Sequence, residues 1–595
     1  MSDNFELAKS EIPQDLDNET PYESKQWNFV NDINSGVYTN SQQSLVQFDL
    51  SSIYNSGAFI DVSQMYLTIP LVYTACFTNN AAAPVAPRAG LGSEFLVTPK
   101  SGSWNIIQSL EVTINGKTVI QQQPNVNFHV NFKMLSQMSE DDLKTLGSTL
   151  GMYPDDAQSY EYHGASSASS TTEGPVGGNG MCNNQIFPVG PNGIASAANG
   201  NEQNAFGTYC APGTVYNSAL QKRSRRMANN MTSGNNGYRD LFSTNNVSAE
   251  FLPNYQLLNT NYMTWYDVAL IRLSDVCDFF QQAPLTKNFD GLLRLYINTG
   301  ALSIGLNQGN LAGMSLSASN SSFVNTCPFL INQMPILNIP NGVTNLAVSL
   351  TIARSTVSQN MNGAILSASA GTHPMNACRC YYPMIKMKPS VALKYISENR
   401  AKKMIYTNVL SNVMTGIGHG VTYSQLIQSG VRNIKGVLII PFLAQSQNGA
   451  LNVGAGTTFA TPIMPFAPYQ SCFDSAPCTT PMSLTQLNVS IGGRNELMNF
   501  YNYTYENFVQ QINLYENINS GDVGISCGLI SQAMWEHAYR YYYVDCSRAA
   551  AADQNSPRNV NITFLNNSQQ AIDVWVFVEY GIESIIDVEL GRIVD

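Results

Sequence analysis

The sequence predicts an all-β protein made of two β-sandwiches in tandem, and three observations support this. The chain has 595 residues, more than one hydrophobic core can organise. Hydrophobic residues make up 44% of it but charged residues only 12%, which favours strands and polar loops over helices. Three motifs also occur twice, in the same order.

The repeated motifs are separated by about 370 residues and indicate a duplicated domain. A single match of this length could arise by chance, whereas three matches in order could not easily do so. The pairs are Val37–Asn40 with Ile405–Asn408, Asn55–Pro70 with Gln428–Pro441, and Leu110–Lys117 with Leu487–Arg494.

The third pair has a direct structural meaning. Leu110, Val112 and Ile114 alternate with polar residues, so a strand would place them all on one face. Asn115–Gly116 and Gly492–Gly493 then supply residues that tolerate positive φ, as a two-residue hairpin turn requires. Each copy therefore predicts a β-hairpin.

A short helix is expected after each hairpin, because apolar residues recur there at helical spacing. A helix N-terminus with an acidic first turn is also expected at Ser139–Asp142. The residues at helical spacing are Phe128, Phe132 and Leu135 in the first copy, and Phe508, Ile512 and Tyr515 in the second.

The remaining strands are short and separated by turn residues, which is typical of antiparallel sandwiches and not of βαβ units. The expected strands are Ile60–Tyr73, Val268–Leu273, Gly291–Asn298, Asn345–Ile352, Cys378–Lys386, Val437–Leu443, Val560–Leu565 and Ile572–Tyr580.

The domain boundaries follow from the repeat and from composition. Residues 1–36 are predicted as an acidic arm, residues 37–398 as the first sandwich and residues 399–595 as the second. The first is longer because polar segments at 155–238 and 307–322 are inserted into it as long loops. We expect these loops to project from one end of the sandwich.

The charge of the chain argues against nucleic-acid binding. Its net charge is −11, so it does not neutralise phosphates, and no specific nucleic-acid partner is expected. The one basic cluster, Lys222–Arg226, is interpreted as a subunit contact or a protected strand edge, with genome contact as the weaker alternative. No secretion signal and no transmembrane segment is expected.

No catalytic, cofactor-binding or metal-binding residue is predicted. The pairs Cys378/Cys380 and Cys472/Cys478 lack partners at zinc-ligand spacing, so the eleven cysteines are expected to be reduced, buried thiols. No nucleophile elbow and no phosphate-binding loop occurs, and Gly416–Gly420 is interpreted as a flexible turn between domains. The five histidines, which form no metal-binding motif, are His129, His163, His373, His419 and His537.

Two acidic clusters are candidates for glycosidase carboxylates by residue type only. They are Glu140–Asp142 and Asp155–Asp156, and a helix start and a solvated loop are the simpler interpretations.

Two segments resemble a known family. The strand Val268–Leu273, the Asp278-Phe279-Phe280 turn, Ala283–Leu285 and the strand Leu292–Ile297 resemble the first jelly roll of major capsid proteins in virophages and nucleocytoplasmic large DNA viruses. Tyr541–Arg548, with the strands that follow it, resembles an element of their second jelly roll. The likeness covers most of the chain from about Gly36 onward.

The resemblance implies two eight-stranded jelly rolls per chain and no enzymatic activity. It implies a homotrimer that forms a pseudo-hexagonal capsomer of an icosahedral shell around double-stranded DNA. The implied partners are neighbouring capsomers, penton and minor capsid proteins, with indirect contact to an inner membrane left open. The implied location is the virion, after synthesis in the host cytoplasm at a viral factory. The acidic arm is expected to point inward.

Two alternatives remain from the residues alone: a β-sandwich adhesin that binds carbohydrate, and a sandwich glycosidase. An adhesin should carry an export signal, disulfides or exposed Trp clusters, and a glycosidase should hold a carboxylate pair in a cleft.

Overall fold

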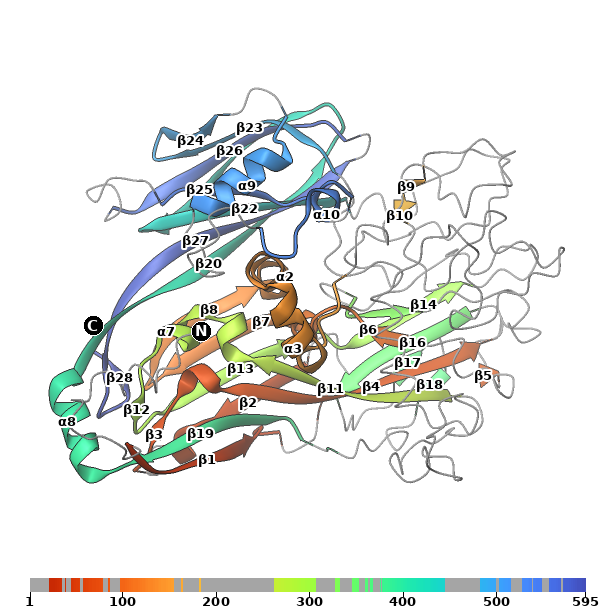
Figure 1. Ribbon diagram of the computed structural model, residues 1–595. Helices are drawn as coiled ribbons and strands as arrows, with labels where there is room; N and C mark the ends of the chain where they lie inside the picture. The colour runs from red at the N-terminus through yellow and green to blue at the C-terminus, as the bar shows by residue number, and fades with distance from the viewer. Residues whose placement is uncertain are drawn as a thin grey trace.

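Two β-sandwiches follow one another along the chain in the computed structural model, and they form the lower and upper lobes of Figure 1. The structure describes residues 21–34, 38, 44–53, 57–78, 84–85, 97–154, 162–163, 181–182, 262–305, 327–331, 345–352, 359–361, 364–366, 375, 377–444, 482–498, 502–514, 527–537, 539–547, 556–568 and 571–594.

The first sandwich is built on eight antiparallel strands in two sheets. In one sheet the neighbours are β1 (Tyr22–Asn31), β19 (Arg379–Met387), β4 (Tyr66–Thr78) and β11 (Tyr262–Arg272), in that order. In the other they are β2 (Ser44–Asp49), β13 (Gly291–Ile297), β7 (Ile107–Ile114) and β8 (Lys117–Pro124).

The second sandwich repeats this arrangement. Its first sheet has the order β20 (Ala401–Ile417), β27 (Ile572–Asp587), β22 (Ile434–Leu443) and β25 (Tyr542–Asp545). Its other sheet has the order β21 (Thr422–Val431), β26 (Arg558–Asn566), β23 (Leu484–Ile491) and β24 (Arg494–Met498).

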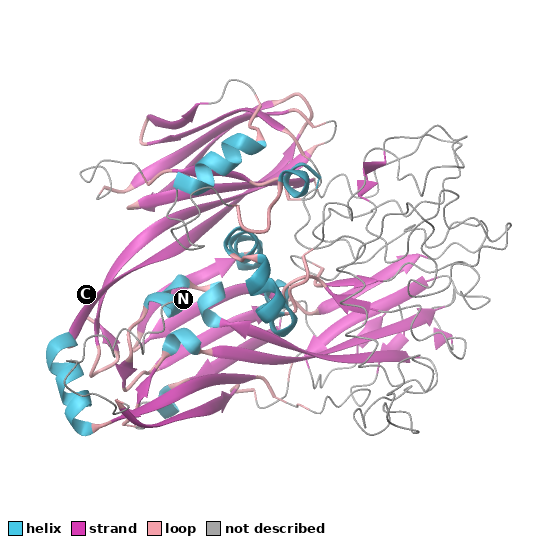
Figure 2. Cartoon of the chain, viewed as in Figure 1, coloured by secondary structure: helices cyan, strands magenta, loops and turns pink. Residues whose placement is uncertain are grey.

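The two sandwiches have the same topology. When their eight strands are numbered in chain order, each sandwich pairs a sheet of order 1-8-3-6 with a sheet of order 2-7-4-5. This is the jelly-roll arrangement of two interlocked Greek keys. The predicted fold class, an all-β chain with two jelly rolls in tandem and a few short helices, is therefore confirmed (Figure 2).

In the second sandwich, β28 (Arg592–Ile593) pairs with β27 and adds a fifth strand to the 1-8-3-6 sheet. More strands are added to the first sandwich. Five of them extend its 1-8-3-6 sheet to nine strands: β3 (Phe59–Ile60), β5 (Pro84–Val85), β12 (Thr286–Lys287), β14 (Gly300–Gly305) and β16 (Asn345–Ile352). Separate two-stranded sheets are formed by β6 (Val97–Pro99) with β15 (Phe329–Ile331), β9 (Tyr162–His163) with β10 (Met181–Cys182), and β17 (Gln359–Met361) with β18 (Ala364–Leu366). Apart from β9 and β10, the predicted insertions at 155–238 and 307–322 lie outside the described residues.

The repeated hairpin forms as predicted in both copies. Asn115 and Gly116 have φ of 46° and 78°, and Gly492 and Gly493 have φ of 56° and 88°. Ile114 pairs with Lys117, and Ile491 with Arg494, so each turn contains two residues. Two successive positive φ values define the type I′ turn that suits the twist of the strands.

The helices predicted after each hairpin also form, although Tyr515 of the second prediction lies outside the described residues. Ser139 accepts a hydrogen bond from the Asp142 backbone while Asp142 accepts one from Ser139, which completes a capping box at the start of α3. The helices are α2 (Val126–Gln137), α3 (Glu140–Leu150), α6 (Leu273–Val276), α7 (Asp278–Gln282), α8 (Pro389–Asn399), α9 (Tyr505–Leu514) and α10 (Gln532–His537), with 3-10 turns at Ser51–Ile53, Val62–Gln64 and Ser103–Ile106.

Strand β1 lies inside the segment predicted as an acidic arm. It pairs along its length with β19, so the first sandwich begins before residue 37, and an arm can extend only over residues that precede the strand. The charged composition of this segment suggested an arm because exposed and half-buried side chains alternate along β1. Glu23 and Lys25 occupy two of the exposed positions. The first repeat match is also not equivalent in structure, since Tyr38 follows β1 whereas Tyr406 lies within β20.

The end of the chain returns to the first sandwich. Helix α8 joins β19 to β20, and the predicted boundary at 398/399 falls at its C-terminal end. After β27, the Val588 carbonyl accepts a hydrogen bond from Lys287 N at 2.8 Å, and the Gly591 carbonyl accepts one from Asn115 Nδ2 at 2.7 Å. One connected set of buried residues runs through both sandwiches, from Tyr38 to Ile586.

Candidate functional site: the interface between the sandwiches

Helix α2 of the first sandwich packs on the outer face of the 1-8-3-6 sheet of the second (Figure 1). The Phe128 ring lies 5.2 Å from Phe442 and 5.4 Å from Trp575, between centroids. Phe132, one turn later, contacts Tyr541 and Tyr543 at 5.3 and 5.5 Å. Aromatic contacts at these separations add to the free energy of burial.

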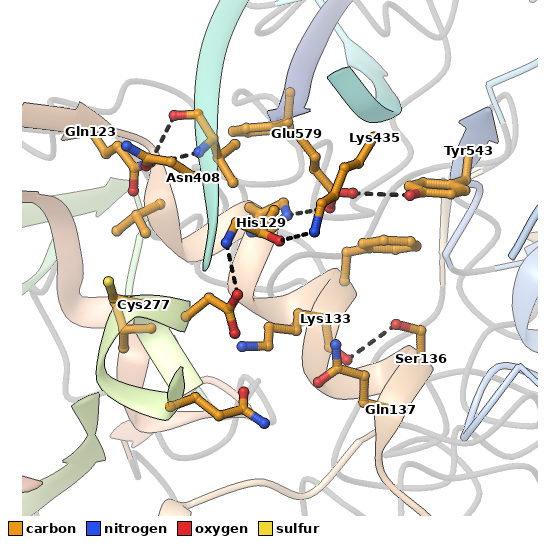
Figure 3. A pocket seen from close by; sticks show the side chains of 18 of the residues that line it. Gln123, His129, Lys133, Ser136, Gln137, Cys277, Asn408, Lys435, Tyr543 and Glu579 are labelled. Atoms are coloured by element: carbon orange, nitrogen blue, oxygen red, sulfur yellow. Dashed lines mark hydrogen bonds and ion pairs between the residues drawn. The ribbon is translucent and has the colours of Figure 1, made fainter. Parts of the chain in front are cut away.

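A buried polar network crosses the same interface. His129 Nε2 of α2 lies 2.7 Å from Glu579 Oε1 of β27, and these side chains are only 12% and 7% exposed (Figure 3). Tyr543 Oη donates to the other oxygen, Glu579 Oε2, at 2.9 Å. Both carboxylate oxygens therefore have partners, as a buried carboxylate requires.

Strand β20 is held by groups of the first sandwich at neighbouring residues, Thr407 to Val409. Asp278 Oδ2 at the start of α7 accepts a hydrogen bond from the Thr407 backbone at 2.7 Å. The Gln123 side-chain amide of β8 donates to the Asn408 side chain and to the Val409 carbonyl. These bonds fix the position of β20 along the interface.

The Asp278-Phe279-Phe280 motif provides one of these contacts with β20, which we call the clamp on β20. The sequence predicts a turn there, but Asp278–Gln282 is the short helix α7. Phe279 meets Tyr406 of β20 edge-on at 5.3 Å, beside the bond from Asp278 to Thr407. The motif therefore connects the two sandwiches.

The C-terminal end of α2 is capped by the second sandwich. Leu529 N donates to the Leu135 carbonyl at 2.8 Å. Gly528 has φ of 61°, and a Cβ at this position would lie 2.4 Å from the Ser136 carbonyl oxygen. Only glycine allows this close approach.

A cavity of about 680 Å³ lies between α2, α7, β20 and the 1-8-3-6 sheet of the second sandwich. Its lining includes His129, Lys133, Cys277, Lys435 and Glu579 (Figure 3). Lys133 Nζ donates to the Ser274 carbonyl, and Lys435 Nζ donates to Thr407 Oγ1. Each lysine therefore bonds within its own sandwich, whereas His129 and Glu579 pair across the interface.

The lining does not have the character of a nucleophilic site. Burial raises the pKa of the Cys277 thiol to about 12, so the thiol stays protonated at neutral pH and is a poor nucleophile. Glu579 has a partner on each oxygen. We therefore interpret the cavity as part of a structural interface.

The residues that the sequence marked as chemical candidates are dispersed. His129 lies in the interface, His163 in β9, and His419 Nδ1 is 2.5 Å from the Ser568 carbonyl oxygen. Gly416–Gly420 joins β20 to β21 inside the second sandwich, so it is not a turn between domains. His537 lies in α10.

The acidic and cysteine candidates have structural surroundings where they are described. Glu140–Asp142 form the first turn of α3. Burial raises the pKa of the Cys378 and Cys380 thiols, and both cysteines are free. Asp155–Asp156, Lys222–Arg226, His373, Cys472 and Cys478 lie outside the described residues.

Two further findings concern only the described part of the chain. No group of three or more His, Cys, Asp or Glu side chains there is placed to hold a metal ion. No helix there is long and apolar enough to cross a membrane. The prediction that the chain has no catalytic, cofactor or metal residues stays a prediction.

An exposed aromatic surface, which sequence reasoning missed, lies on the outer face of the first 1-8-3-6 sheet. We call Trp27, Phe29, Tyr66 and Tyr381 the aromatic face. Trp27 and Phe29 are 49% and 47% exposed. The Tyr66 and Tyr381 rings stack at 4.9 Å, and Trp27 and Phe29 each lie within 5.6 Å of one of them. The sequence signal for this surface is that Trp27 and Phe29 are two residues apart in a strand, which places both rings on the same side.

The sheet order defines the chain as a double jelly-roll protein. No family of known sequences and no curated protein matches it. The motifs at Asp278–Phe280 and Tyr541–Arg548 resemble the major capsid protein of the Sputnik virophage, and a cryo-EM structure of that virophage is among the solved structures that match. It covers 98% of this chain and 91% of its own, with 10% identity and a TM-score of 0.44.

Two other matches are also viral capsid structures. The Faustovirus major capsid protein covers 97% of this chain and 93% of its own, with 10% identity and a TM-score of 0.37. A quasi-atomic PBCV-1 virus capsid covers 97% and 98%, with 10% identity and a TM-score of 0.36. The sheet order of this chain, more than these scores, establishes its fold.

Proposed function

We propose that the chain is a major capsid protein that assembles as trimers into the icosahedral shell of a double-stranded DNA virus. The observation that supports this most is the pair of jelly rolls with identical strand order in one chain. Three such chains present six similar sandwiches, which is the number needed to fill a pseudo-hexagonal tile.

The interface between the sandwiches suits this role. A shell tile must keep its two halves in a fixed relation, and here α2, α7 and the end of the chain join them through packed rings and buried hydrogen bonds. The low content of charged residues fits a protein whose sides meet other protein surfaces, because unpaired charge is costly to desolvate.

The proposed role is structural, with no catalysis and no cofactor. The proposed partners are two further copies of the chain, neighbouring capsomers, and penton and minor capsid proteins. The proposed location is the virion, after synthesis in the host cytoplasm.

Light scattering and negative-stain imaging of the purified full-length chain would test the proposal. We expect a stable particle of three times the chain mass, 65.1 kDa, with a six-lobed outline. A chain that stays monomeric at all concentrations, or one that cleaves glycans, would contradict it.

A further inference from the structure

The duplication defines which surfaces of the two sandwiches are equivalent. By position in the sheet order, β1 corresponds to β20, β19 to β27, and β4 to β22. Helix α2 corresponds to α9, because each follows the second strand of the repeated hairpin. A contact that one of these elements makes in one sandwich therefore has an equivalent position in the other sandwich.

Within the chain, the outer face of the second 1-8-3-6 sheet receives α2. Its outward side chains on β27 alternate with the core residues, and Trp575, Phe577 and Glu579 all contact α2. The contact is head-to-tail, since the helix side of one sandwich meets the sheet face of the next. Such contacts close into rings when the rotation between units divides a full turn.

The equivalent face of the first sandwich is the aromatic face. Figure 1 shows β1 and β19 on the side of the first sandwich that points away from the second. Tyr66, Tyr381 and Phe29 lie on one rung across three strands, because Tyr381 pairs with both Phe29 and Tyr66. The guanidinium of Arg379 lies 4.6 Å from the Phe29 ring centroid.

We propose that the aromatic face binds the α9 side of the second sandwich in a neighbouring copy of the chain. This repeats between chains the contact that α2 makes within one chain, and it rests on the proposed capsid function. Three contacts within chains and three between chains then join six sandwiches into one closed ring.

Part of the charge on the two surfaces is complementary. The aromatic face has Arg379 over its Phe29 ring and Lys25 at an exposed position of β1, whereas Lys386 of β19 is already paired with Glu23 at 2.7 Å. The helix side of the second sandwich carries Glu506 at the start of α9 and Glu536 in α10. Exposed aromatic rings beside a cation are also the side chains that most often dominate binding energy at protein interfaces.

The test is the double variant Trp27→Ala/Phe29→Ala, compared with the wild type and with Leu393→Ala. Leu393 is a matched control, since it is 71% exposed on α8, away from the aromatic face. Analytical ultracentrifugation over a concentration series gives the association constant, and far-UV circular dichroism checks that each variant is folded. We expect the double variant to weaken trimers at least about 30-fold, while Leu393→Ala leaves them unchanged.

A position-specific cross-link gives a second measurement that does not depend on stability. Chains carrying Phe29→Cys are mixed with differently tagged chains carrying Glu506→Cys and oxidised. We expect a disulfide between the two tags, and no product when Leu393→Cys replaces Phe29→Cys.

Each outcome decides a different point. If the wild type forms trimers and the double variant forms them equally well, the inference is wrong but the capsid function stands. If the wild type never associates, both are wrong. If oligosaccharides quench Trp27 fluorescence and the double variant still trimerises, the aromatic face is a sugar platform and not a subunit contact. Loss of trimers in Leu393→Ala to the same extent would also overturn the inference.

Discussion

The outer faces of the two 1-8-3-6 sheets share a topology but differ in their surroundings. In the second sandwich, Phe577 and Glu579 are buried under α2. In the first, Trp27 and Phe29 of β1, on the equivalent face, stay about half exposed. The duplication therefore leaves two equivalent faces in different states, one covered by α2 within the chain and one exposed.

The largest loss of stability is expected when a ring of α2 is removed from the sheet face that this helix covers, which we call the covered face. Phe128→Ala should lower the free energy of unfolding by about 3–5 kcal/mol, because Phe128 is fully buried against Phe442 and Trp575. Urea unfolding of dilute, monomeric chain measures this. The matched Trp27→Ala change should cost less than about 1 kcal/mol, and equal costs for the two would remove the distinction between the faces.

A smaller loss is expected from the polar network of the covered face. Glu579→Ala leaves the His129 ring and the Tyr543 hydroxyl without their shared acceptor, at a cost of about 2–3 kcal/mol. Glu579→Gln keeps an acceptor for Tyr543 and should cost less. Differential scanning calorimetry of both variants gives the comparison, and identical melting temperatures for Ala and Gln would show that the network is not needed.

The clamp on β20 should contribute less again. Asp278→Ala removes the acceptor of the Thr407 backbone N–H and should cost about 1–2 kcal/mol. Hydrogen exchange at the Thr407 amide is the direct measurement, and we expect faster exchange there than in Asp141→Ala. Asp141 is a suitable control because its side chain is exposed and pairs with Lys144 on the same helix, α3. Unchanged protection at Thr407 would contradict the clamp.

The smallest effect concerns the cap of α3, far from either face. Ser139→Ala should cost about 1 kcal/mol at neutral pH. Hydrogen bonds from the Ser139 backbone and hydroxyl lower the pKa of Asp142 below its usual 3.8. The cap is therefore stabilising above pH 3.8 and is lost as the pH falls through the lower folded value. The stability difference between wild type and variant should shrink in acid, and a difference that is constant with pH would argue against this.

Local patterns in the sequence predicted the repeated elements well. Two-residue turns, alternating strands and helical spacing are properties of a few neighbouring residues, so Leu110–Lys117 and Leu487–Arg494 reveal their hairpins directly. Strand β1 was harder to predict from the sequence, because it lies at the edge of its sheet and exposes polar side chains beside Trp27. An edge strand of this kind has the composition of a surface segment.

The interface could not be predicted in this way. His129 and Glu579 are 450 residues apart in the chain, and neither belongs to a motif. Phe128 and Phe132 could be assigned to a helix, but helical spacing does not say which sheet their rings will meet. The Asp278–Phe280 motif was recognised by resemblance, yet its contact with Thr407 and Tyr406 depends on how the two sandwiches pack.

The hydrogen bonds that the first sandwich donates to the Val588 and Gly591 carbonyls have a consequence for synthesis. A ribosome completes the early strands of that sandwich long before it makes residues 588–591. Until then, Lys287 N and Asn115 Nδ2 lack the carbonyl acceptors that they have in the folded chain. Strand β1 likewise cannot form its ladder until β19, about 350 residues later, has been made. Chains that lack residues 588–591 therefore keep an incomplete first sandwich even after all of its own strands have been made.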